Sequence, residues 1–266
     1  LISSILISLF DLYPQFSLRT GLASLFGLSN IYLFKQSTDY FSQSTELNIF
    51  THTWSLGVEE QFYFVFPFLC WFSGFSRQIK GGSRNLFLLI APLTVLSLIS
   101  FVYLYPTNQP AAYFLMPTRF WEMASGCLIF LLFEKRPSIE QSLRRVPPSL
   151  LIILIISLMF LPLSFAVIST ISVISLTSIL LASLKKNTAA FTVFTHPTVV
   201  YIGLISYSLY LWHWCIFSIS RWTIGIHWWS IPIQILLIFV LSILSYRFIE
   251  CPLRKGHWFG RKSLTF

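Results

Sequence analysis

Long apolar runs alternate with short polar connections along most of the chain. A first run occupies about 1–10, and a weaker one at about 20–34 is interrupted by Gly27, Ser29 and Asn30. Stronger runs, several near the roughly 20 residues with which a helix crosses a bilayer, lie at about 56–75, 86–105, 119–133, 149–164, 167–184, 199–219 and 231–249. The pattern predicts an all-α fold, a polytopic transmembrane helical bundle of about eight spans, with 20–34 either spanning or re-entrant.

Composition supports a membrane protein. Of the 266 residues, 55% are hydrophobic and only 10% are charged, whereas a soluble domain carries about 25% charge. The mean hydropathy is +0.74. So few charges cannot cover a water-facing surface of this length. We therefore expect one membrane domain over 1–266, with the lipid bilayer as its surroundings.

The formal net charge of +9 raises the question of a nucleic-acid partner. Lys and Arg cluster in short loops between apolar runs, as the positive-inside rule requires, so we expect no nucleic acid to bind. The basic loops predicted to be cytoplasmic are 76–84, 134–145, 183–187 and 251–262. The loops poorer in Lys and Arg, predicted to be periplasmic, are 36–53, 106–118 and 221–230.

The cysteines indicate neither a metal site nor a disulfide framework. Cys70, Cys127, Cys215 and Cys251 are far apart, without a CxxC pair or a histidine at metal-ligand spacing. We expect no metal and no bound cofactor.

Placing an ionisable side chain inside a membrane-spanning apolar run costs roughly 3 kcal/mol or more of free energy. Each such residue therefore needs a partner or a function. The first such group is His52, Glu59 and Glu60, at the start of the helix expected from about 56. Glu59 shares a helix face with Tyr63, while Glu60 points about 100° away, and we expect at least one carboxylate to face the bundle. The acidic residues either stabilise the start of the helix electrostatically or belong to a catalytic set. In the second case a carboxylate acts on a substrate hydroxyl and Tyr63 contacts the substrate.

Two further groups lie on later helices. Arg119 and Glu122 are three residues apart and can pair, either as a structural ion pair or with Arg119 binding an anionic group of a substrate. Ser206, Tyr210 and His213 form one polar stripe on an otherwise apolar helix. His213 is either a hydrogen-bonded structural residue or a catalytic one. No Asp follows nearby, so a local Ser-His-Asp triad is not supported.

The fourth group is Arg247 with Glu250, at the cytoplasmic end of the last predicted helix, which we expect Pro252 to end. These residues are either a structural clamp or substrate-binding groups, with Arg247 meeting the phosphates of a cytoplasmic donor. By themselves the four groups fit a transporter or an intramembrane enzyme.

Four segments together resemble the acyltransferase-3 family of O-antigen and peptidoglycan O-acetylases. They are "HTWSLGVEEQFYFVFP" (52–67), "PTRFWEMASG" (117–126), "IGLISYSLYLWHWCI" (202–216) and "SYRFIECPLR" (245–254). The resemblance implies transfer of an acyl group, commonly acetyl from acetyl-CoA, to hydroxyls of envelope carbohydrate. The implied partners are acyl-CoA as donor substrate and a carbohydrate or lipid-linked sugar as acceptor. The implied location is the bacterial inner (cytoplasmic) membrane, which the chain crosses several times.

The sequence also departs from the family pattern. Gly57 stands where the family usually has Ser or Ala. The family's proposed catalytic histidine lies on its first membrane helix, in an Arg-x10-His pattern that this sequence does not contain. The resemblance therefore implies that the chain begins within the third helix and that 20–34 does not fully cross. The alternatives to an acyltransferase are a non-catalytic remnant and a bundle that binds or transports a lipid-linked sugar, although the inverted repeats typical of transporters are not evident.

Overall fold

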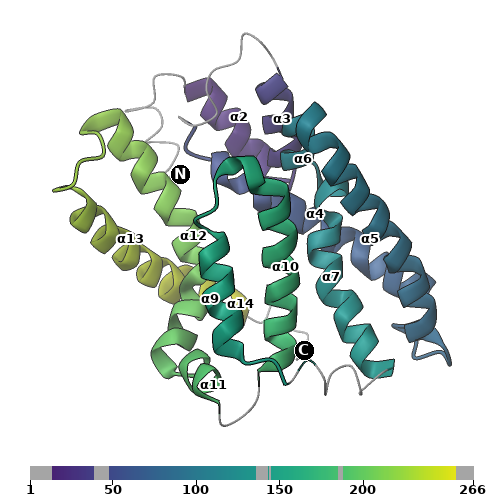
Figure 1. The fold of residues 1–266 in the computed structure, drawn as a ribbon. Helices are drawn as coiled ribbons and strands as arrows, with labels where there is room; N and C mark the ends of the chain where they lie inside the picture. Colours follow the sequence, from purple (N-terminus) through teal and green to yellow (C-terminus); the bar gives the residue numbers. More distant parts are fainter. Residues whose placement is uncertain (1–13, 39–47, 136–142, 144, 185–187, 256–266) are drawn as a thin grey trace. The chain divides into compact units, whose positions relative to one another are not determined.

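The computed structural model describes residues 14–38, 48–135, 143, 145–184 and 188–255. Within these ranges every regular element is a helix, which confirms the all-α fold class (Figure 1). In chain order the elements are α2 (Pro14–Leu25), α3 (Ser29–Thr38), η2 (Thr51–Thr53), α4 (Trp54–Phe72), α5 (Gly82–Thr107), α6 (Gln109–Phe114), α7 (Met116–Lys135), α9 (Pro148–Leu158), η3 (Leu163–Phe165), α10 (Ala166–Ser183), α11 (Ala189–Phe194), α12 (Pro197–Thr223), α13 (Ile231–Ser245), η4 (Tyr246–Glu250) and α14 (Cys251–Lys255). The predicted helix at 1–10 lies outside the described residues.

The chain forms two compact units, each with its own helix packing. Unit 1 consists of the described residues of Leu1–Leu22, Ser44–Thr53 and His196–Phe266, and in it α12 packs against α13. Unit 2 consists of the described residues of Ala23–Gln43 and Trp54–Thr195. In unit 2, α5 packs along α7 and α9 along α10.

Unit 2 has an apolar core built by α4, α5 and α7. Its buried members are Val58, Phe62, Leu86, Ile90, Met116, Phe120, Ala124 and Leu131. A second cluster packs Phe101 and Trp121 against side chains of α10. Together these contacts fix the orientation of α7, the helix that carries Arg119 and Glu122.

The weak apolar segment expected at 20–34 is divided between two helices. α2 ends at Leu25 and α3 begins at Ser29, with Gly27 between them at a φ of 65°. Glycine adopts this left-handed backbone without steric cost, so Gly27 permits the break. Neither helix exceeds 12 residues, and about 18 Å of helix is shorter than the roughly 30 Å hydrocarbon core.

The helix predicted at 149–164 is shorter than expected. α9 has 11 residues and ends at Leu158, and a 3-10 turn, η3, leads from Pro162 into α10. Proline disfavours the helical conformation in the residue before it, which explains why the helix does not continue through Leu161. The two apolar runs expected at 149–164 and 167–184 thus form a short helix followed by a long one.

The expectation that Pro252 ends the last helix is wrong, because the chain stays helical as far as Lys255. The π-helical turn η4 precedes α14, and the Cys251 N–H donates to the Tyr246 carbonyl five residues earlier. This wider turn shifts the hydrogen-bond register just before the proline, where a regular α-helix would meet a clash and lose a hydrogen bond.

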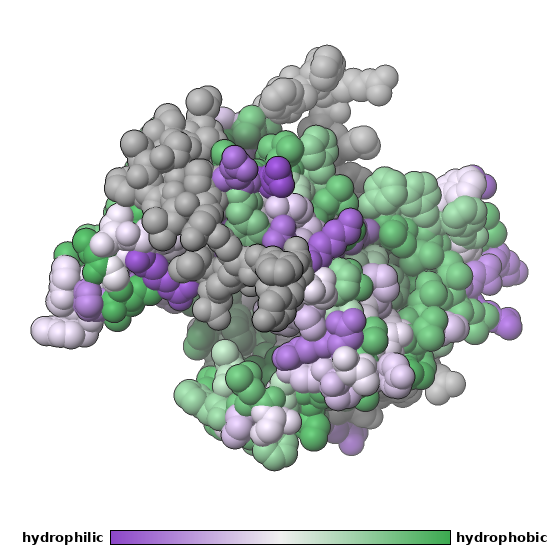
Figure 2. Space-filling model, turned by 90° about the horizontal axis from the view of Figure 1, so that it is seen from above, coloured by the Kyte–Doolittle hydropathy of each residue, from purple (hydrophilic) through white to green (hydrophobic). Residues whose placement is uncertain are grey.

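The surface of the described helices suits a hydrocarbon environment. Four stretches are long and apolar enough to cross a membrane, namely Gly82–Thr107, Leu163–Ser183, Pro197–Thr223 and Ile231–Lys255. At most 28% of the most apolar window of any of them is buried inside the protein, so most of these side chains face outward. Figure 2 shows hydrophobic residues over much of the visible surface, with hydrophilic residues in smaller groups. The full number of spans stays a prediction.

Candidate functional site

In unit 1, the segment before α4 lies against α12. Asn48 is almost completely buried, and its side-chain nitrogen donates to the Thr20 hydroxyl at 2.6 Å. Its carbonyl oxygen accepts a hydrogen bond from the Trp214 indole at 2.9 Å. The Tyr210 hydroxyl donates to the carbonyl oxygen of His52. These bonds hold His52 beside the middle of α12.

The structure brings together three residues predicted to be functional, and we call His52, Tyr210 and His213 the histidine cluster. The His52 ring centroid lies 5.2 Å from that of Tyr210 and 5.7 Å from that of His213, both edge to face. The two histidines are more than 150 positions apart in the sequence, so their proximity is a result of the fold.

Hydrogen bonding and burial set the protonation of this cluster. Nδ1 of His213 lies 2.6 Å from the carbonyl oxygen of Tyr210. Because a carbonyl oxygen can only accept, this bond places a proton on Nδ1 and, in the neutral ring, leaves the lone pair on Nε2. Burial, and secondarily the neighbouring His213, lower the pKa of His52 to about 3. His52 is therefore neutral at physiological pH, and the cluster offers an imidazole nitrogen that can take a proton.

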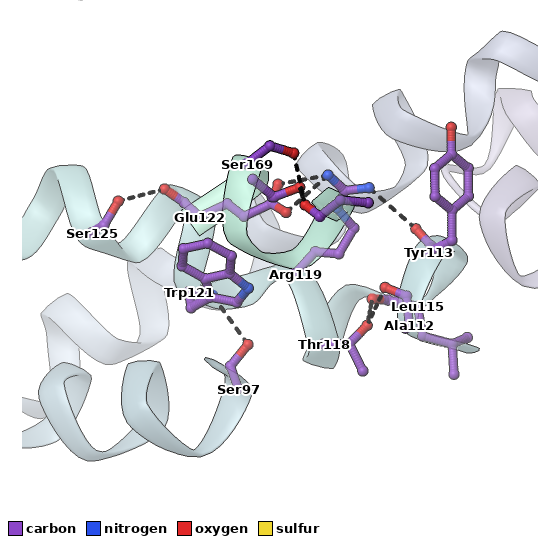
Figure 3. Close-up of polar contacts among 12 residues, drawn as sticks. Ser97, Ala112, Tyr113, Leu115, Thr118, Arg119, Trp121, Glu122, Ser125 and Ser169 are labelled. Carbon is purple, nitrogen blue, oxygen red and sulfur yellow. Dashed lines mark hydrogen bonds and ion pairs between the residues drawn. The ribbon is translucent and has the colours of Figure 1, made fainter. Parts of the chain in front are cut away.

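Unit 2 holds the predicted ion pair of Arg119 and Glu122, and the structure confirms that the pair forms. Nη2 of Arg119 lies 2.8 Å from Oε1 of Glu122 and donates to its Oε2 at 2.9 Å. The guanidinium carbon also lies 5.0 Å from the ring centroid of Trp54 and 5.6 Å from that of Tyr113. Figure 3 shows Arg119 extending between Glu122 and Tyr113. The cation is thus paired with a carboxylate and stacked on aromatic rings.

A cavity of about 430 Å³ opens beside this pair. Its remaining walls come from the end of α9, the Pro162 turn and the first half of α10. Ser169 and Thr170 also line the cavity, and their hydroxyls donate to the Ala166 carbonyl of their own helix. Side chains of Arg119 and Glu122 are each about one fifth exposed, so a ligand in this cavity meets a charged pair on otherwise largely apolar walls.

The adjacent carboxylates of α4, Glu59 and Glu60, are both exposed by surface area. The Glu60 carboxylate nevertheless lies beside the α2–α3 junction, because a Cβ added at Gly27 would come within 2.4 Å of its Oε2, which agrees with the expectation that at least one carboxylate faces the bundle. Glu60 lines a separate, larger cavity of about 780 Å³ in unit 2. Tyr63, predicted to contact substrate, is 64% exposed on the same helix. The α4 backbone begins at Trp54, and its buried face is taken by Val58 and Phe62 instead.

The polar stripe predicted on α12 is only partly correct. Tyr210 and His213 belong to the histidine cluster, whereas Ser206 is exposed. The buried serine is Ser208, whose hydroxyl donates to Oε2 of Glu250 at 3.2 Å. The helix turns 100° per residue, so Ser208 lies about 160° from Ser206, on the side that meets the C-terminal helix.

Of the two interpretations of Arg247 and Glu250, a structural clamp between them is not formed, and the substrate-binding role stays a prediction. Glu250 pairs with Arg254 at 3.1 Å, and Arg247 is exposed, with its guanidinium carbon 6.0 Å from the Phe248 ring centroid. Both residues of the predicted pair lie in the π turn η4, where residues three apart no longer stack as they do on an α-helix. The C-terminal carboxylate is thus part of a helix contact in unit 1.

Some residues of these sites were not identified from the sequence. Asn48 lies in a loop with no periodic pattern, and the sequence pattern does not single out Trp54 or Trp214 as contacts of the candidate residues. A polar residue such as Asn48 becomes notable only when it is known to be buried, because buried polar groups need hydrogen-bond partners. For Trp54 and Trp214, the available signal in the sequence is that aromatic residues lie close to the predicted charged groups.

Comparison with known sequences identifies relatives. A sequence model of acyltransferase family 3, described as "Acyltransferase domain", matches residues 1–247. Over 267 aligned residues the chain is 30% identical to the O-acetyltransferase OatA of Staphylococcus aureus strain NCTC 8325 / PS 47, covering 93% of this chain and 42% of that protein. OatA of strains COL and MRSA252 gives the same values. The chain thus spans 42% of the length of these relatives. No solved structure matches.

Proposed function

Because the chain belongs to acyltransferase family 3, we propose that it transfers an acyl group, acetyl in the first instance, from an acyl-CoA to a hydroxyl of a cell-envelope carbohydrate. The relatives named as O-acetyltransferases support the reaction class. The long apolar helices support a location in the membrane, and the proposed membrane is the bacterial inner membrane. The acyl-CoA is a substrate in this proposal.

The observation that carries the proposal is the geometry of the histidine cluster, in which the His52 and His213 rings lie 5.7 Å apart and Nδ1 of His213 lies 2.6 Å from the Tyr210 carbonyl oxygen. In this mechanism Nε2 of His213 takes the proton of the acceptor hydroxyl as that oxygen attacks the thioester carbonyl carbon. A C–O bond forms, the C–S bond breaks, and the imidazolium of His213 gives its Nε2 proton to the departing thiolate of coenzyme A, which returns His213 to the neutral form. Neutral His52 adds no positive charge beside the imidazolium that forms on His213. The hydrogen bond from Nδ1 to the Tyr210 carbonyl stabilises that imidazolium.

The ion pair in unit 2 has a different proposed role. Arg119 places positive charge at the wall of the 430 Å³ cavity, and guanidinium groups bind phosphate and carboxylate groups with two parallel hydrogen bonds. We assign Arg119 to the binding of an anionic substrate group, with Glu122 as the residue that orients it. Among the carboxylates of α4, we favour Glu60 over Glu59 as the one that acts on a substrate hydroxyl, because Glu60 lines a cavity.

The test replaces His213 by Gln in the protein at its full natural length. Membranes that contain the variant receive radiolabelled acetyl-CoA and envelope polysaccharide, and acetylated product is counted. Loss of the base should lower turnover by roughly 100-fold or more, with the amount of folded protein unchanged.

The matched control is His196→Asn, at the start of the same helix. His196 is exposed and its ring nitrogen accepts a hydrogen bond from the Thr198 N–H, a capping role that Asn also performs well. This variant should keep wild-type turnover. Equal turnover in His213→Gln and His196→Asn would remove His213 from the mechanism.

A further inference from the structure

Two long helices of unit 1 are joined by a loop that the proposed mechanism does not use. α12 ends at Thr223 and α13 begins at Ile231, and the two helices pack against each other (Figure 1). We call residues 224–230 the hairpin loop. It lies within 221–230, which is poor in Lys and Arg and is therefore predicted to be periplasmic.

The hairpin loop and its flanks bury polar side chains and expose large apolar ones. Ser220, Ser230 and Gln234 are buried, whereas Trp228 is 85% exposed. The other exposed large apolar side chains of the loop are those of Ile224, Ile226 and Trp229. A loop that faces water has the opposite arrangement, because exposed apolar patches and buried polar groups are both unfavourable there.

Hydrogen bonds within the protein satisfy the buried polar groups. The Ser220 hydroxyl donates to the Gly225 carbonyl at 2.9 Å, and the Gly225 N–H donates to the Ser220 carbonyl at 2.7 Å. The Ser230 hydroxyl donates to the His227 carbonyl at 2.9 Å. The Gln234 side-chain nitrogen joins the two sets, because it donates to the hydroxyls of Ser220 at 2.6 Å and Ser230 at 3.0 Å. A backbone bonded in this way can enter a medium that offers few hydrogen-bond partners.

The surroundings of the hairpin loop carry no charge. No Asp, Glu, Lys or Arg lies between Arg221 and Arg247 in the sequence. Arg221 extends back along α12, with its guanidinium carbon 5.4 Å from the ring centroid of Trp214. On α13 the exposed side chains that follow the loop, such as Ile233 and Leu236, are apolar. The apolar surface of the loop therefore continues into a helix that is apolar enough to cross a membrane.

The length of α13 relates the loop to the thickness of a bilayer. The uncharged helix Ile231–Ser245 has 15 residues, about 22 Å at 1.5 Å per residue. It is followed by Arg247, Glu250 and Arg254, and the hydrocarbon core is about 30 Å thick. A helix shorter than the core thins the bilayer or draws its flanking residues toward it. An apolar loop at the other end of α13 can fill the missing depth.

We infer that the hairpin loop is an interfacial anchor, which lies at the boundary between headgroups and acyl chains on the periplasmic side and contacts phospholipid. Tryptophan favours this boundary because its ring is apolar and its N–H is polar. The rings of His227 and Trp229 stack with centroids 5.7 Å apart and an interplanar angle of 10°, which adds a second amphipathic surface. His213 lies ten residues before the end of α12, about 15 Å along the helix, so the anchor sets the depth of the histidine cluster in the bilayer.

The test measures what the loop contacts. A photoreactive diazirine analogue of phenylalanine replaces Trp228 in the protein at its full natural length, reconstituted in nanodiscs of phosphatidylethanolamine and phosphatidylglycerol. After irradiation, mass spectrometry identifies the adducts, and phospholipid should be the main one. The control carries the same analogue at Gln109, an exposed polar residue of the connection 106–118, where water should be captured instead.

Three other results would overturn the inference. Capture of water at position 228 would place the loop in solvent, and a covalent dimer would mean that a second copy covers it. Capture of added envelope polysaccharide would make the loop a carbohydrate contact. Equal phospholipid capture at positions 228 and 109 would likewise show that the loop has no special contact with the bilayer. Every readout is a contact of the loop, so the result is independent of acyl transfer by the His213 site.

A charged variant tests the cause of the lipid contact. Ile224→Glu combined with Ile226→Glu should lower phospholipid capture at position 228 about tenfold, because carboxylates are costly at the edge of the hydrocarbon. Val193→Glu, at an exposed apolar residue of α11, should leave that capture unchanged. Thermal unfolding in the same nanodiscs checks that the variants are folded, and the capture at position 228 without these substitutions decides the inference if the double variant is not. Undiminished phospholipid capture in a folded double variant would refute an anchor that depends on apolar side chains.

Discussion

The two units differ in how they accommodate an ionisable side chain: unit 1 buries a histidine, and unit 2 pairs an arginine with a carboxylate. In unit 1 burial lowers the pKa of His52 to about 3. Its ring lies edge to face against the Tyr210 ring, and its backbone carbonyl accepts a hydrogen bond from the Tyr210 hydroxyl. In unit 2 the guanidinium of Arg119 pairs with Glu122 and stacks against two aromatic rings. Burial thus favours the neutral form of a histidine in one region, whereas a permanently charged group is paired in the other.

Because of this difference, each unit is suited to a different chemical role. A neutral imidazole with a free lone pair can take a proton, whereas a paired guanidinium cannot and instead attracts anions. We therefore associate proton transfer with unit 1 and substrate recognition with the two cavities of unit 2. A change of pH that protonates a histidine of unit 1 should therefore not alter the charge of Arg119 in unit 2.

The largest expected stability effect concerns the pH dependence of His52. The pKa is 6.5 in the unfolded chain and about 3 in the fold, so His52 has no effect on the pH dependence well above pH 6.5. Below that pH His52 binds a proton in the unfolded state but stays unprotonated in the folded state. The free energy of unfolding should therefore fall by about 1.4 kcal/mol per pH unit, or about 2 kcal/mol by pH 5.

Thermal unfolding in detergent at pH 7.5 and pH 5 measures this effect. His52→Gln should reduce the difference between the two pH values, because Gln does not titrate. The variant loses some stability at both pH values, so the comparison is the change with pH rather than the absolute midpoint. An equal pH-dependent loss in wild type and variant would show that His52 does not remain neutral in the fold.

The next effect concerns recognition in unit 2. Arg119→Lys keeps the positive charge but loses the planar group that stacks on Trp54 and pairs with Glu122. We expect kcat/KM to fall about tenfold, mainly through KM. Acetyl transfer at varied acyl-CoA and varied acceptor concentrations identifies which substrate Arg119 contacts.

Arg77→Lys is the matched control for that variant. The Arg77 guanidinium carbon lies 4.7 Å from the Trp71 ring centroid, so the substitution removes a similar cation–π contact on an exposed surface. It should leave kcat/KM unchanged. If both lysine variants lose the same activity, the defect reflects lost packing on the rings and not substrate recognition.

The same contrast explains which features could be predicted from the sequence. The pairing of Arg119 with Glu122 is local, and an α-helix brings residues three apart together, so the prediction was correct. The same spacing failed for Arg247 with Glu250, because the turn is π-helical. Local rules hold only where the local geometry is the expected one.

Long-range contacts were beyond such rules. His52 and His213 were both selected as candidates, but nothing in the sequence indicated that their rings lie 5.7 Å apart. The larger cavity likewise depends on Gly27 and Asn30 meeting a helix that begins more than 20 residues later. Apolar periodicity predicted helices and their order, whereas helix ends depended on single residues such as Pro162 and the π turn.

The smallest effect tests the polar end of the larger cavity through Gly57. A Cβ at Gly57 would lie 2.9 Å from Oδ1 of Asn30 and 3.2 Å from the Gly27 carbonyl oxygen. Asn30 is fully buried and bonded to Gln61 and Phe114, so it cannot easily move away. Although alanine favours the helix by up to about 1 kcal/mol, overpacking costs about 1–3 kcal/mol. Gly57→Ala should therefore lower the free energy of unfolding by about 1 kcal/mol.

Gly126→Ala on α7 separates packing from helix propensity. No atom lies within 4 Å of a Cβ added at Gly126, so this variant should gain up to about 1 kcal/mol from propensity alone. Unfolding midpoints of the two variants, measured in the same detergent, should move in opposite directions. Because the resembling family usually has Ser or Ala at the position of Gly57, a stabilised Gly57→Ala would mean that Asn30 and Gln61 adjust readily. In that case the polar end of the cavity is not rigid, and unit 2 would not differ from unit 1 in holding its polar residues in a fixed arrangement.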